Sequence, residues 1–218
     1  MVLKSLSDGR EILEFLDSFG VPVYITPGNW EWISRNEKWD FLNQDHYSKL
    51  KKGLKNVVDV DMRRVDIGNY EFIGHGRTSG PEYPQHQDVI DSMTEKELEK
   101  AKAGYDKLTR NVSRLFDRAR KPVIFMSHNV PYNTSLDMIT NKESPRYGYH
   151  YGSVLARDMI EQYQPLVCIG GHMHEHFNKE MLGKTTVINA GFGSQVNTLL
   201  ILENGRIKSL KFHPKTYG

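Results

Sequence analysis

The chain has 218 residues, of which 38% are hydrophobic and 26% are charged, and its formal net charge at pH 7 is +2. A length of this order fits one domain with a substantial core, so we expect a single domain over residues 1–218. The near-neutral charge gives no clear sign of a nucleic-acid surface. The one cysteine, Cys168, excludes an intrachain disulfide and a zinc cluster built from several thiolates.

The first twenty residues carry charges throughout and contain no apolar run of the kind that a secretory signal requires. No later segment approaches the roughly 18 consecutive apolar residues that a membrane span needs. We therefore expect a soluble, cytoplasmic protein with no membrane partner.

Helix and strand patterns alternate along the chain. Apolar spacing predicts a helix over residues 8–19, and the segment 21–26 predicts a short strand that stops at Pro27 and Gly28. Residues 57–74 have the pattern of two or three strands. Residues 78–93 contain two prolines and predict a surface loop.

The longest helix is predicted to begin at Thr94, because Thr94 and Glu97 have the spacing of a capping box and an apolar stripe continues to Ala119. Near the C-terminus, Asn204 and Gly205 separate two alternating segments and predict a hairpin. The order of elements predicts an α/β fold with a mostly parallel core. The remaining predictions are a strand at 123–127, a helix at about 152–163, and strands at 166–170, 186–190, 197–202 and 206–212.

Polar side chains follow three of these strands. Asn29 comes after the first strand, His128 after the strand at 123–127, and His172 and His174 after the strand at 166–170. In open α/β sheets, ligands bind beyond the carboxyl ends of the parallel strands. These side chains are therefore expected to converge if the three strands are neighbours. Imidazole nitrogens with an amide oxygen suit a divalent transition metal such as Mn, Fe, Zn, Ni or Co.

Each of these residues also has an ordinary interpretation. A single histidine after a strand is often a surface or hydrogen-bonded residue, Asn29 after Pro-Gly fits a turn, and short histidine pairs occur in loops. Their shared position at strand ends is what favours a metal site. His176, which continues the alternation after His174, is expected to lie beside the site rather than in it.

Four stretches, "PVYITPGNWE", "FMSHNVPYNTSLD", "VCIGGHMHEHF" and "VINAGFGS", resemble in order and spacing the calcineurin-like metallophosphoesterases, in particular small prokaryotic members. The resemblance extends over about residues 8–212. It implies an α/β layered fold of mixed sheets flanked by helices. It also implies a metal-dependent phosphomonoesterase or phosphodiesterase, in which a metal-bound hydroxide attacks phosphorus at a dinuclear centre. Carried over by position, Asn29, His128 and His172 would bind one metal and His174 the other.

The chain departs from the family pattern before Asn29. The family begins with a strand ending in Asp-x-His and a second ending in Gly-Asp, which supply most ligands of the second metal, and no such motif precedes Asn29. The resemblance therefore implies an N-terminally incomplete domain that holds one metal, or two with added ligands. Its exposed sheet edge would be covered by an oligomer or a second chain. Asp59 and Asp61 follow Asn29 and are interpreted as strand-edge polar residues.

Trp30 stands where many family members carry the histidine proposed to protonate the leaving group. An indole N–H does not act as a general acid near pH 7.

The candidate substrate-binding residues are Arg77, Asn129, Tyr132 and His150. In the alternative interpretation, the stretch around Arg77 is a mobile glycine-rich loop and the other three residues are structural. Asp137 receives no role.

Three functional hypotheses follow. The first is a metal-dependent hydrolase of a phosphoester small molecule or nucleotide, active only if the missing N-terminal ligands are supplied. The second is a catalytically inactive metal-binding or interaction module that retains the phosphoesterase fold. The third, less favoured, is a metal-dependent hydrolase of another kind of ester.

Overall fold

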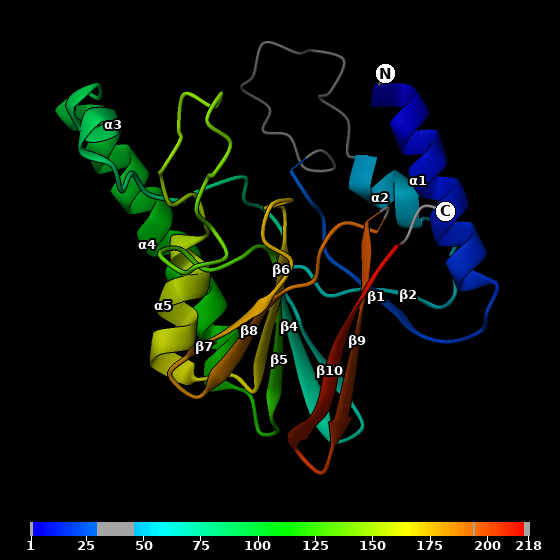
Figure 1. The fold of residues 1–218 in the computed structure, drawn as a ribbon. Coiled ribbons are helices and arrows are strands. Elements are labelled where there is room, and N and C mark those ends of the chain that lie inside the picture. Colours follow the sequence, from blue (N-terminus) through cyan, green and yellow to red (C-terminus); the bar gives the residue numbers. More distant parts are fainter. Residues whose placement is uncertain (1, 30–45, 194, 216–218) are drawn as a thin grey trace.

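A six-stranded mixed sheet forms the centre of the computed structural model, which describes residues 2–29, 46–193 and 195–215 (Figure 1). The strand order is β3-β4-β5-β6-β8-β7. Strands β4, β5, β6 and β8 are parallel, so the carboxyl ends of β4, β5 and β6 lie at one edge of the sheet. Its strands are β3 (Arg64–Ile67), β4 (Tyr70–His75), β5 (Val123–Asn129), β6 (Val167–Gly171), β7 (Lys179–Leu182) and β8 (Thr185–Asn189).

Two helices, α4 (Glu95–Asp117) and α5 (Val154–Tyr163), cover one face of this sheet (Figure 1). The predicted capping box is present, because Thr94 Oγ1 accepts from the Glu97 amide and the Glu97 carboxylate accepts from the Thr94 amide. Alternate strand residues face these helices and form the main core with them. Its buried members include Ile73, Val112, Phe116, Phe125, Leu155, Met159, Ile160, Cys168 and Val187.

The other face of the sheet packs against a hairpin of β9 (Val196–Glu203) and β10 (Arg206–Pro214). The predicted turn is confirmed, since Asn204 and Gly205 have φ values of 51° and 74°. Positive φ at both central residues is typical of a type I′ hairpin turn. Inward residues of the hairpin such as Leu200 and Leu202 pack on the smaller core, while Leu199 and Ile201 point outward and are exposed.

A third group contains β1 (Val23–Ile25), β2 (Val57–Asp59), α1 (Val2–Asp17) and α2 (His46–Lys51). Strand β1 pairs in parallel with β2 in a sheet of its own. The expectation that the first strand is a sheet neighbour of β5 and β6 is therefore wrong. The group reaches the central sheet through a bridge between Asp61 and Gly74, where the missing Cβ of Gly74 leaves room for the Val60 backbone.

Several local predictions need correction. The first helix begins at Val2, not at residue 8, and the predicted loop 78–93 contains a short helix, α3 (Gln87–Asp91). The edge strand β7 was not predicted. Strand β7 and helix α3 are only four and five residues long and have weak apolar patterns, so periodicity does not reveal them. The predicted mixed α/β class with a mostly parallel core is confirmed.

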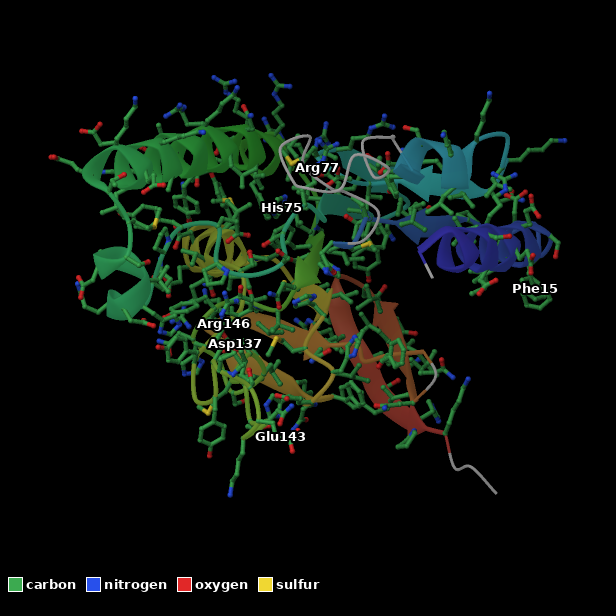
Figure 2. All side chains as sticks on the ribbon, turned by 90° about the horizontal axis from the view of Figure 1, so that it is seen from above. Phe15, His75, Arg77, Asp137, Glu143 and Arg146 are labelled. Carbon is green, nitrogen blue, oxygen red and sulfur yellow. The ribbon has the colours of Figure 1, made fainter. Side chains whose placement is uncertain are left out.

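Large apolar side chains remain exposed on α1 and just after it, namely Ile12, Phe15 and Phe19. Figure 2 shows Phe15 on the outer side of this helix. No helix within the described ranges is long and apolar enough to cross a membrane. The single thiol, Cys168, is fully buried in the main core, and burial raises its pKa above the ordinary value.

Candidate metal centre

Three predicted ligands meet beyond the carboxyl end of β5. The Nε2 atom of His128 lies 2.9 Å from Oδ1 of Asn29 and 3.1 Å from Nδ1 of His172. Ligand atoms bound to one ion at 2.0–2.1 Å are about 3 Å or slightly more apart. The two measured separations therefore fit ligands of a single metal ion.

Each of the three side chains reaches this point by a different route. His128 lies on β5, His172 directly follows β6, and Asn29 follows β1. Strands β5 and β6 are parallel neighbours, as the sequence predicted. Asn29 comes from outside the central sheet. It is held near His128 because the segment before it packs closely on Gly76, where a Cβ atom would lie 2.1 Å from the Pro27 carbonyl oxygen.

The backbone at His172 is left-handed, with φ of 66°. This conformation is uncommon for residues other than glycine. It belongs to a tight turn in which the Met173 amide donates to the Gly171 carbonyl at 2.7 Å. The turn sets the His172 ring edge-on to His128, with the ring centroids 4.9 Å apart. The backbone of Ser79 lies close enough to the His172 ring to raise its pKa, which places the loop after β4 beside this histidine.

The surroundings keep both rings neutral near pH 7. Burial, followed by the nearby His172, His75 and His174, lowers the pKa of His128 to about 4. Burial and then His174 lower the pKa of His172 as well. A neutral imidazole has the lone pair that a metal requires, so both residues are in the protonation state suited to ligation.

His75, at the end of β4, was not singled out from the sequence. It is fully buried, and among the described residues neither ring nitrogen has a hydrogen-bond partner. Its Nε2 lies 3.6 Å from Oε1 of Glu82, slightly beyond hydrogen-bond distance. Burial alone would raise the pKa of Glu82, but His75 and the donors Ser153 and Leu155 outweigh burial and lower it. The signal that identified His128, a polar residue at a strand end, also applies to His75.

The other two histidines of the alternating run lie apart from the cluster. His174 is exposed, and its ring stacks on Phe192 with the centroids 4.6 Å apart. It is nevertheless close enough to influence the pKa of His128. His176 is hydrogen-bonded through Nε2 to the Met138 carbonyl at 2.7 Å, consistent with its expected position beside the site.

Arg77 lies in the loop from Gly76 to Gly80, the same loop whose Ser79 contacts His172. Its Nε donates to Oδ2 of Asp61 at 2.6 Å, and the other Asp61 oxygen accepts from the Gly76 amide at 3.0 Å. Figure 2 shows Arg77 next to His75 at this edge. The interpretation of Asp61 as a strand-edge polar residue is thus wrong, because its carboxylate is buried and anchors the loop.

The remaining substrate candidates occupy different environments. Asn129 is fully buried and donates to the Tyr151 carbonyl at 2.8 Å, so it has no surface with which to meet a substrate. Tyr132 and His150 are partly exposed, and their ring centroids are 6.0 Å apart. Burial, followed by Asp137, raises the pKa of Tyr132.

The side chains of this cluster can be compared with the ligands that divalent metal ions prefer. The described part of the chain contains no group of three His, Cys, Asp or Glu side chains placed to hold a metal. Asn29 takes the third position beside His128 and His172, and two nitrogens with one amide oxygen fit a borderline divalent cation. Trp30, which follows Asn29, lies outside the described residues.

Comparisons with known proteins bear on the family and the fold of the chain. A family model described as calcineurin-like phosphoesterase matches residues 6–176. One crystal structure aligns with a TM-score of 0.61 and 15% identity, covering 98% of this chain and 73% of that chain. The crystal structure of TT1561 from Thermus thermophilus aligns with a TM-score of 0.55 and 17% identity, covering 96% and 79%. At these identities the likeness shows the fold. No curated protein matches the chain.

Proposed function

Since this chain belongs to the calcineurin-like phosphoesterase family, whose members are metal-dependent phosphoester hydrolases, we propose that it hydrolyses a phosphomonoester or phosphodiester at the Asn29–His128–His172 cluster. The observation that carries the proposal is the convergence of these three donor atoms at 2.9 and 3.1 Å. The substrate would be a phosphoester small molecule or a nucleotide.

In this proposal Asn29, His128 and His172 hold one divalent ion, and His174 contributes to a second. The bound ions would neutralise phosphate charge and make water nucleophilic near neutral pH. In this proposal the described residues supply three ligands to the first ion, and the second ion takes most of its ligands from outside the described residues. We further propose that residues 1–218 act as one domain, and that an added segment or second chain completes the centre.

The second candidate function is a metal-binding or interaction module without turnover. It is favoured by the absence, among the described residues, of a carboxylate cluster for a second metal. This candidate predicts binding of a single ion and no hydrolysis under any metal condition.

The test is hydrolysis by the purified protein, prepared together with the added segment or second chain that completes the centre and supplied with Mn, Co or Zn. The substrates are p-nitrophenyl phosphate, bis(p-nitrophenyl) phosphate and p-nitrophenyl acetate. We expect metal-dependent release of p-nitrophenol from one or both phosphoesters, suppressed by a chelator, with no comparable acceleration of the acetate. Metal binding without turnover supports the second candidate, whereas faster cleavage of the acetate supports a different esterase.

Arg77 is proposed to contact the negatively charged part of the substrate. Arginine is well suited to phosphate oxygens, and the buried Asp61 carboxylate fixes the direction of its guanidinium. We expect Arg77→Ala to raise KM about 10-fold, the loss of one charge-assisted hydrogen bond. Metal content should be unchanged.

The matched control is Arg64→Ala. Arg64 pairs at 2.9 Å with Glu71, another buried carboxylate, but at the opposite end of β4. This variant removes a similar ion pair and should leave KM unchanged. Equal effects of the two variants on KM would contradict a substrate role for Arg77.

A further inference from the structure

Asp137, which received no role from the sequence, is fully buried and saturated with donors. Its carboxylate accepts from the amides of Asn133 at 3.0 Å, Thr134 at 2.9 Å and Gly152 at 2.9 Å. Its Oδ1 also lies 2.7 Å from Nδ1 of His150. Three backbone donors from two segments hold this carboxylate, so its position relative to His150 is fixed.

The contact determines how His150 presents its ring. A carboxylate at Nδ1 selects the form that is protonated there and leaves Nε2 as the outward atom. The His150 side chain is 25% exposed, and within the described ranges no hydrogen bond reaches Nε2. The backbone is restrained too, since the His150 carbonyl accepts from Nε2 of His86 at 2.9 Å. This is a fixed imidazole with one accessible nitrogen.

The segment that carries His150 lies among the loops of the candidate metal centre. Tyr151 accepts from Asn129, the neighbour of His128. The Tyr151 ring also packs on Gly80, at the end of the loop that contacts His172, where a Cβ atom would lie 2.7 Å from it. Figure 2, which looks down on this edge, shows Asp137 from the same segment.

A second connection runs through the loop after β6. His150 forms an antiparallel bridge with Met138, whose carbonyl binds His176. The loops after β4 and β6 therefore both contact the loop after β5, which carries Asp137 and His150.

We propose that His150 is the proton donor to the leaving group and that Asp137 is its positioning residue. The inference rests on the proposed phosphoester hydrolysis. Water adds to phosphorus and releases one proton to solvent. The P–O bond to the leaving group breaks, and its electron pair stays on the leaving oxygen. That oxygen takes the proton from Nε2 of the doubly protonated His150 ring, which keeps its Nδ1 proton on Asp137, and Nε2 regains a proton from solvent.

Other nearby histidines are less suited to this step. His128 and His172 belong to the candidate metal centre, His75 is fully buried, and His176 is bonded to the Met138 carbonyl. The residue after Asn29 is a tryptophan, which does not donate a proton near neutral pH. Among these histidines, His150 alone combines an accessible nitrogen with a carboxylate partner on the other nitrogen.

The test compares His150→Gln with the wild type, both supplied with metal, on two substrates: an alkyl phosphate and p-nitrophenyl phosphate. An alkoxide needs a proton to leave, whereas p-nitrophenolate leaves without one. We expect kcat for the alkyl phosphate to fall about 100-fold, the usual worth of a positioned acid, and kcat for the aryl phosphate to change less than about 3-fold. Metal content should remain that of the wild type.

Two further variants separate positioning from structure. Asp137→Asn should reproduce the selective loss, and nitrogen-15 NMR of the histidine rings should show the Nδ1 proton of His150 lost or shifted, with or without metal. His86→Gln, which alters a backbone contact of the same segment, should affect both substrates alike. Equal slowing of both substrates by His150→Gln, or no slowing, overturns the inference alone. A wild type without turnover overturns the proposed function and the inference with it.

Discussion

Replacing His128 with alanine is expected to abolish metal-dependent turnover and to weaken binding of the first divalent ion at least about 100-fold. The expected loss is large because Nε2 of His128 is common to both short separations, 2.9 Å to Oδ1 of Asn29 and 3.1 Å to Nδ1 of His172. Without it, an amide oxygen and a single imidazole remain. Those two donors do not hold a borderline cation against water.

Calorimetric titration with Zn or Mn, and the visible spectrum of bound Co, measure this change. The matched control is His176→Ala, which removes an imidazole from the same run of histidines but one that binds the Met138 carbonyl. The control should bind metal as the wild type does. An unchanged affinity in His128→Ala would show that the metal binds elsewhere.

Gly76→Ala is expected to lower the free energy of unfolding by about 2–3 kcal/mol, at the upper end of the usual cost of overpacking. A Cβ atom here would lie 2.1 Å from the Pro27 carbonyl oxygen and 2.4 Å from Oγ1 of Thr26. The obstacle is partly backbone, so the segment 26–27 must move, and Asn29 with it. We therefore expect metal affinity to fall as well.

Urea unfolding and the same metal titration measure the two effects. Gly104→Ala is the matched control, because Gly104 lies within α4 and a Cβ there would have no atom within 4 Å. In a helix interior this change should raise stability by up to about 1 kcal/mol. A Gly76→Ala protein with unchanged stability and metal affinity would contradict the close packing of this segment.

The convergence of candidate ligands was predictable because it follows from strand ends. His128 and His172 follow parallel neighbouring strands, and that geometry alone brings them together. Asn29 also arrives at the site, but from a strand outside the central sheet. A three-residue strand has too few side chains for its pattern to specify a partner, so the sequence could not assign its sheet.

The contacts that support the site were not predictable in the same way. Asp137 and His150 are 13 residues apart in irregular segments, and only the fold-back of the chain shows that they meet. Asp61 looked like an edge residue because burial at a strand end depends on what packs over it, here the loop carrying Arg77. The complete burial of His75 at the end of β4 likewise depends on the segments that pack over it.

The left-handed turn at His172 decides which ligand deletion is the cleanest. An alanine at φ of 66° keeps the unfavourable backbone conformation, at a cost of about 1–2 kcal/mol that has nothing to do with the imidazole. Glycine adopts that conformation without penalty. His172→Gly therefore removes the ring while leaving the main-chain bend between Gly171 and Met173 relaxed. A metal-binding defect of the same size in His172→Gly and His172→Ala reports on the lost nitrogen, because the two variants differ in the backbone cost at this position.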